Sequence, residues 1–170
     1  MMTKPAVLVT TRQRLSETTL AIYAAITLLG VIAAASWKGL FVEGSEFVVI
    51  IIATALTVAV AHVWATVAAH RLVRREALPG SEWRLELRNS LAVFVVGGLA
   101  VAAFLITTAA GAELAGAVAF TLLMLVAVLF VVGVVGGRRE SRSWLHSVGL
   151  GLLDSSIGVV ILVAKVTLGA

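Results

Sequence analysis

The sequence predicts an all-α polytopic membrane bundle of five transmembrane helices, and its composition and charge distribution support this fold class. Hydrophobic residues make up 61% of the 170 residues and charged residues 13%, against roughly 45–50% and 25% in soluble proteins. A water-soluble domain of this length cannot bury so much apolar surface, so lipid must surround much of the chain. No cysteine is present, which excludes disulfides, thiolate metal ligands and cysteine nucleophiles.

The first two spans follow a basic amino-terminal segment. Ser16 and Glu17 suit the start of a helix, through capping and through negative charge at the positive end of the helix dipole. The second span contains His62 and ends near His70. We interpret the strongly charged residues 71–88 as an interfacial elbow that leads into the next span and is too short for a separate soluble domain. Pro79 and Gly80 break it into two parts, and Ser81 can cap a new helix with Glu82 in its first turn.

The last three spans are separated by short connections, so residues 1–170 are expected to form a single transmembrane domain. Glycine and alanine make the turn before the fourth span, and a basic loop precedes the fifth. The five expected spans are residues 16–37, 46–69, 89–109, 113–135 and 144–168.

The basic residues predict the orientation of the chain. The amino-terminal segment holds three Lys or Arg, residues 71–88 hold five and residues 138–142 hold three, so five spans place 11 of the 13 on one side. Basic residues near span ends favour the cytoplasm, which predicts a cytoplasmic N-terminus, an outside C-terminus and a multi-pass protein of the cell membrane. The same distribution explains the net charge without a nucleic-acid partner.

Asp154 is the main candidate functional residue, because it lies about ten residues, or roughly 15 Å, into an apolar helix. An ionised carboxylate at that depth costs on the order of 2.5–3.5 kcal/mol and must face protein or water. His62 lies at a similar depth in the second span, so the two side chains could share a proton or hold a cation, with Ser155 beside them. The alternative is that Asp154 is a protonated packing residue and His62 a satisfied polar one.

Other polar residues carry weaker hypotheses. Glu17 and His70 are candidates for an entrance, although each also suits a helix end or the membrane interface. Haem ligation by His62 together with His70 or His146 stays open as a minor alternative, as does a divalent metal; no cofactor is predicted. The sequence contains none of the common hydrolase, phosphate-binding or zinc-protease motifs, so we do not expect an enzyme.

Small residues at four-residue spacing predict close helix packing in the last two spans. Such stripes allow backbones to approach in lipid, and here they also suggest a homo-oligomer, most simply a homodimer. The residues concerned are Gly111, Ala115 and Ala119 in the fourth span and Ser147 and Gly151 in the fifth.

The segment 136–161, GGRRESRSWLHSVGLGLLDSSIGVVI, follows four spans and a charged connection after the second. In these features the chain resembles the vacuolar iron transporter family, where a short basic loop also leads into a Gly-rich last helix. The resemblance implies a five-span fold and iron transport. The family's long glutamate-rich connection corresponds here only to residues 71–88, and its acidic and methionine pore ligands have no matching residues. The Ala/Val-rich spans and residues 61–65 also resemble small actinobacterial integral membrane proteins without an assigned role.

Two functions are therefore compatible with the sequence. The first is a small transporter or channel for a cation or a proton that uses Asp154 and His62. The second is a non-transporting membrane subunit or scaffold, whose polar residues only fix helix packing. The position of Asp154 within its span favours the first.

The charge distribution makes a testable prediction of topology. A tag at the N-terminus should resist protease added to intact cells, whereas a tag at the C-terminus should be cleaved, because the 11-to-2 division of basic residues keeps the basic ends in the cytoplasm. Cleavage of both tags from the same side would contradict an odd number of spans.

Overall fold

The computed structural model describes the backbone of residues 4–77, 79–139 and 143–168. These residues form helices and no strand: α1 (Lys4–Trp37), α2 (Gly44–Arg74), α3 (Gly80–Ala109), α4 (Leu114–Arg139) and α5 (Trp144–Leu168). Each helix contains a segment long and apolar enough to cross a membrane. The prediction of an all-α bundle with five spanning helices is therefore confirmed.

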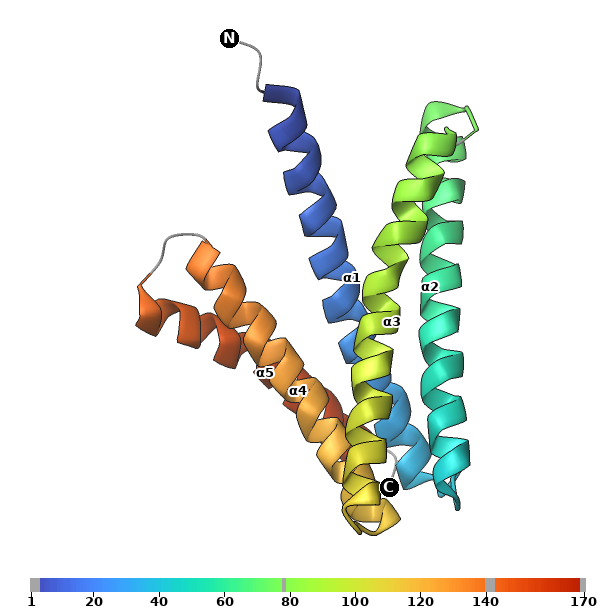
Figure 1. Ribbon diagram of the computed structural model, residues 1–170, viewed down its shortest axis with the longest axis vertical. Coiled ribbons are helices and arrows are strands. Elements are labelled where there is room, and N and C mark those ends of the chain that lie inside the picture. The colour runs from blue at the N-terminus through green and yellow to red at the C-terminus, as the bar shows by residue number, and fades with distance from the viewer. Residues whose placement is uncertain (1–3, 78, 140–142, 169–170) are drawn as a thin grey trace.

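The bundle consists of two antiparallel helix pairs, which are joined through α1 and through a direct contact between α3 and α4 (Figure 1). α2 packs on α3, and α4 packs on α5, while α1 contacts all four other helices. The α4–α5 pair is inclined to the α2–α3 pair, and the connection between α2 and α3 lies at the same end of the bundle as the start of α1 (Figure 1). The α1–α2 and α3–α4 connections lie at the opposite end.

A cluster of aromatic rings closes the end of the bundle at which α2 begins. Phe47 of α2 and Phe104 of α3 are 0% and 2% exposed, and their ring centroids lie 4.4 Å apart. Phe41, in the connection before α2, packs edge-on against Phe47. Gly44 lets the chain pass beside this cluster, because a Cβ there would come within 3.1 Å of the Phe104 ring. The interior of this end of the bundle is therefore apolar and tightly packed.

The structure differs from the sequence prediction at residues 71–88, which are not an elbow between two membrane spans. α2 continues to Arg74 and α3 already begins at Gly80, so most of this charged segment lies in the ends of two long helices. In the connection between them, Arg75 has a left-handed backbone with φ 56°, and Pro79 is the N-cap of α3. Glu, Arg and Leu favour helix, and the carboxylates of Glu82 and Glu86 contact histidines on the facing helix. α1 likewise begins at Lys4, well before the predicted start at residue 16.

Glycines bring α4 and α5 into close contact. A Cβ at Gly137 would come within 2.8 Å of the Ser147 Cα, and one at Gly151 within 2.7 Å of the Phe130 carbonyl oxygen. Ser147 is fully buried in this contact. Side chains larger than a hydrogen atom would force the two backbones apart, so these small residues determine the separation of the helices.

Gly151→Ala should lower the stability of the purified protein, because its Cβ would meet Val134 and Phe130 at 2.6 and 2.7 Å. Overpacking of this kind costs about 1–3 kcal/mol. Gly149→Ala is the matched control on the same helix, since a Cβ there meets nothing within 4 Å. Thermal or denaturant unfolding in detergent measures both variants, and equal stabilities would contradict the close contact.

Candidate functional site

Histidine and glutamate side chains meet between α2 and α3. His62 Nε2 lies 3.1 Å from Glu86 Oε2, and His70 Nδ1 lies 3.6 Å from Glu82 Oε2. Arg74 reaches the other oxygen of Glu82 at 3.9 Å. We call these five residues the polar seam. Each contact crosses from one helix to the other, so the seam fixes the register of the α2–α3 pair.

Helical spacing explains why these residues meet. His62, Thr66 and His70 are four residues apart on α2, and Glu82 and Glu86 are four apart on α3, so each set lies along one helix face. The Thr66 hydroxyl donates to the His62 carbonyl oxygen at 3.1 Å. That hydroxyl is satisfied within its own helix, which leaves the imidazoles and carboxylates to form the contacts between helices.

The outermost side chains of the seam are exposed, and those farther inside the bundle are largely or partly buried. The Arg74 and Glu82 side chains are 59% and 45% exposed, whereas Glu86 is 19% and His62 28% exposed. His70 lies between these pairs and is 8% exposed. The seam therefore leads from charged groups at the end of the bundle to a partly buried His–Glu pair within it.

The polar character of the α2–α3 contact stops shortly beyond His62. Asn89 and Ser90 are buried one turn after Glu86, and Ser90 donates to the Glu86 carbonyl oxygen at 2.9 Å. Farther along, the helices touch through Ala55 and Gly97, where a Cβ on the glycine would lie 3.1 Å from the Ala55 Cβ. The aromatic cluster follows. Among the described residues, the polar seam thus covers only one half of this helix pair.

Asp154 occupies a separate place, in the contact between α5 and α4. Its side chain is partly buried, and a Cβ added to Gly133 would come within 2.6 Å of its Oδ2. No other side chain in residues 17–77, 79–139 and 143–164 forms a hydrogen bond or an ion pair with this carboxylate. The Ser155 hydroxyl donates to the Leu152 carbonyl oxygen of its own helix at 3.0 Å.

The structure does not bring His62 and Asp154 together, contrary to the expectation from their similar depth. α2 packs mainly on α3 and α1, whereas α5 packs mainly on α4 and α1. The partner of His62 is Glu86. Sequence reasoning missed this carboxylate because it assigned residues 71–88 to an elbow. The four-residue spacing of Glu82 and Glu86 was the signal that could have identified it.

The remaining predicted residues lie at several places in the bundle. Glu17 is partly buried in α1, and His146 is exposed in the first turn of α5, where its backbone N–H donates to the Ser143 hydroxyl at 3.3 Å. Gly111 is in the α3–α4 turn with φ 89°, and Ala115 and Ala119 are exposed on α4. Within the described part of the chain, no group of three or more His, Asp or Glu residues could hold a metal ion.

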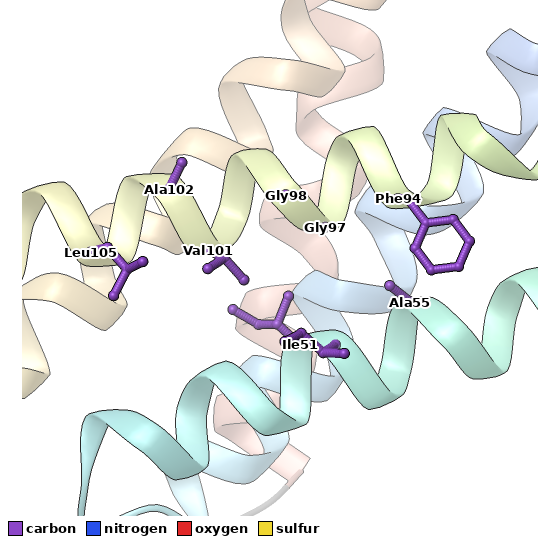
Figure 2. A pocket seen from close by; sticks show the side chains of 9 residues that line it. Ile51, Ala55, Phe94, Gly97, Gly98, Val101, Ala102 and Leu105 are labelled. Carbon is purple, nitrogen blue, oxygen red and sulfur yellow. The ribbon is translucent and has the colours of Figure 1, made fainter.

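Several grooves open on the sides of the bundle, and two of them involve the α2–α3 pair. The first, of about 510 Å³, lies between α1 and α2 and reaches His62; we call it the His62 groove. The second, of about 390 Å³, lies between α2 and α3 and is lined by apolar side chains and glycines. Figure 2 shows Phe94, Val101 and Leu105 of α3 facing Ile51 and Ala55 of α2 across this second groove.

Comparison with known proteins adds no assignment. No protein-family model matches this sequence, and neither a curated protein nor a solved structure matches it significantly.

The two His–Glu contacts should differ in strength. Double-mutant cycles with His62→Ala and Glu86→Ala should give a coupling free energy of about 1–3 kcal/mol, because each single variant leaves a partly buried polar group unsatisfied. The cycle with His70→Ala and Glu82→Ala should give less than about 1 kcal/mol, since the contact is longer and Glu82 is exposed. Unfolding in detergent measures both cycles, and the reverse ranking would contradict the seam geometry.

Proposed function

We propose that this chain is a small integral membrane protein that transfers protons through polar side chains within its bundle. The observation that supports this proposal is the His62–Glu86 pair, whose atoms lie 3.1 Å apart inside a membrane-spanning helix pair. Histidine is the side chain that exchanges a proton near neutral pH. Ionisable residues inside membrane helices mark proton or ion pathways more often than packing contacts.

The seam supplies a route between this pair and one end of the bundle. A proton can pass from water to Glu82 and His70, and from there to Glu86 and His62, because these groups alternate along one helix contact. The distribution of basic residues predicts that this end of the bundle faces the cytoplasm. In this proposal Glu86 and His62 hold the proton, and the outer pair exchanges it with water.

Asp154 is the proposed second proton-holding group. Its carboxyl group lies in a different helix contact from the seam, on the glycine surface of α4. In this proposal the Asp154 carboxyl group exchanges a proton with water or with a basic group that reaches it.

A non-transporting membrane subunit is the second candidate function, and a specific observation favours it. Beyond the seam, α2 and α3 touch through Ala55 and Gly97 and then through the rings of Phe47 and Phe104. Such packing gives a proton no polar group to follow. In this second function the His–Glu contacts only specify which helices associate.

Four further predictions from the sequence concern assembly, location, cargo and ancestry. These are the homodimer, the cell membrane as location, the transport of a metal ion and the kinship with vacuolar iron transporters. The exposed small-residue face of Ala115 and Ala119 is compatible with a second copy or with lipid.

Proton flux into reconstituted vesicles tests the proposal. With an internal pH-sensitive dye and an imposed membrane potential, His62→Ala and Glu86→Gln should each lower the wild-type flux at least tenfold, a change of about 1.4 kcal/mol in barrier height. Glu113→Gln should leave it unchanged, because this residue is exposed at the other end of the bundle. Far-UV circular dichroism verifies folding of each variant.

Asp154→Asn separates the two proposed proton-holding groups. It keeps the shape of the side chain but removes the titratable proton, so flux should fall as it does for Glu86→Gln. An unchanged flux would remove Asp154 from the pathway while the His62–Glu86 role stands. Absence of any flux through the wild type would favour the membrane subunit instead.

A further inference from the structure

A third groove, of about 540 Å³, opens on the side of the bundle between α1, the start of α2 and α5; we call it the Lys38 groove. Its α1 residues follow one another in alternating steps of one and three, so they form a single stripe along that helix. Small residues on the stripe leave room beside larger side chains of all three helices. The small residues are Gly30, Ala34 and Ala35, and the larger ones include Ile26, Ile50 and Ile161.

The length of the Lys38 groove matches one leaflet of a bilayer. Ile26 and Lys38 are 12 residues apart, or roughly 18 Å along the helix axis. One leaflet contributes about 15 Å to a hydrocarbon core of about 30 Å. Lys38 directly follows Trp37, the last residue of α1 and of its candidate span. The groove therefore runs from the membrane interface to the region of the bilayer midplane.

The part of the groove within the hydrocarbon region offers no free polar group. Thr27 is its polar side chain there, and the Thr27 hydroxyl donates to the Tyr23 carbonyl oxygen of the same helix at 2.8 Å. The rest of the lining between Ile26 and Ala35 is apolar. An acyl chain satisfies such a surface, because it buries apolar area and needs no hydrogen bond.

The interfacial end of the groove carries a positive charge. Lys38 is exposed and is the only charged residue in the lining. None of the described carboxylates forms an ion pair with its ammonium group. The two acidic residues of the nearby α1–α2 connection contact their own segment: Glu46 Oε2 accepts the backbone N–H of Val42 at 2.7 Å, and Glu43 Oε2 accepts the Ser45 hydroxyl at 3.3 Å. The Lys38 ammonium is thus available to an anion at the membrane surface.

We propose that the Lys38 groove binds an anionic phospholipid, with one acyl chain along the α1 stripe and the phosphate at the Lys38 ammonium. The two ends of the groove match the two parts of such a lipid, since a cation lies at the interface and an apolar channel one leaflet long leads away from it. The inference goes beyond the proposed function, because a chain that moves no protons would still bind the lipid.

The second groove, between α2 and α3, offers a matched comparison because no charged side chain lines it (Figure 2). A glycine lines each groove. A Cβ at Gly30 meets only the Ile161 Cγ2, at 3.8 Å, and a Cβ at Gly98 meets nothing within 4 Å. Leucine therefore fits on either backbone, and its side chain fills the groove beside it.

Quenching of Trp37 fluorescence by brominated phospholipids in nanodiscs tests the inference. Trp37 is 48% exposed and adjoins Lys38, and replacing the other three tryptophans by phenylalanine makes it the only reporter. Brominated phosphatidylglycerol and brominated phosphatidylcholine are compared, which gives their relative binding constant at this end of the groove. The unaltered groove should favour phosphatidylglycerol about fivefold, the effect expected of one lysine near a membrane surface.

Substitutions at the two ends of the groove separate a lipid site from general attraction to the membrane surface. Lys38→Gln should bring the ratio close to one, and Lys38→Arg should preserve it. Gly30→Leu should also remove the preference, because the acyl chain loses its place, whereas Gly98→Leu should leave the preference unchanged. Lys38 is exposed, so its variants keep the test valid if Gly30→Leu fails to fold.

Three results would overturn the inference. A ratio near one before any groove substitution would mean ordinary annular lipid. A preference that survives Lys38→Gln or Gly30→Leu would mean attraction to the surface charge of the protein without a site. Protection of Trp37 from both brominated lipids would mean that a second copy of the chain covers the groove.

Discussion

The contact between His62 and Glu86 constrains the α2–α3 pair, because lipid offers neither side chain a hydrogen-bond partner. With their atoms 3.1 Å apart, the two residues fix how far α2 is shifted along α3 and how each helix is rotated. The His70–Glu82 contact repeats the constraint nearer the end of the bundle, eight residues along α2 and four along α3. Sliding either helix by one turn would leave a partly buried imidazole and a carboxylate exposed to hydrocarbon.

The α4–α5 pair is held by a different physical means. Gly133, Gly137 and Gly151 let the two backbones approach until a methyl group would not fit, and van der Waals packing then replaces polar contacts. The same small residues make the space in which the Asp154 carboxyl group lies. One hairpin therefore depends on paired polar side chains, and the other on the absence of side chains.

His62 lies where the polar seam meets the side of the bundle. The polar seam reaches it from one end of the bundle, and the groove between α1 and α2 reaches it from the side. Farther along the α2–α3 contact the interior is filled by the rings of Phe47 and Phe104. Polar contacts therefore hold one half of this helix pair, and apolar packing holds the other.

The sequence by itself determined the membrane environment, the five helices and the bounds of α5, because hydropathy over about 20 residues is a local property that tertiary contacts do not override. It also identified His62 and Asp154 as polar residues within spans. Only the tertiary structure decided their neighbours. Two residues at equal depth can lie on opposite sides of a bundle, and which helices pack together depends on distant side chains, so Glu86 and Gly133 as partners could not be derived from depth alone. At residues 71–88 the four-residue spacing of Glu82 and Glu86 is a local sign of helix, but their partners on α2 are distant in the sequence and appear only in the tertiary structure.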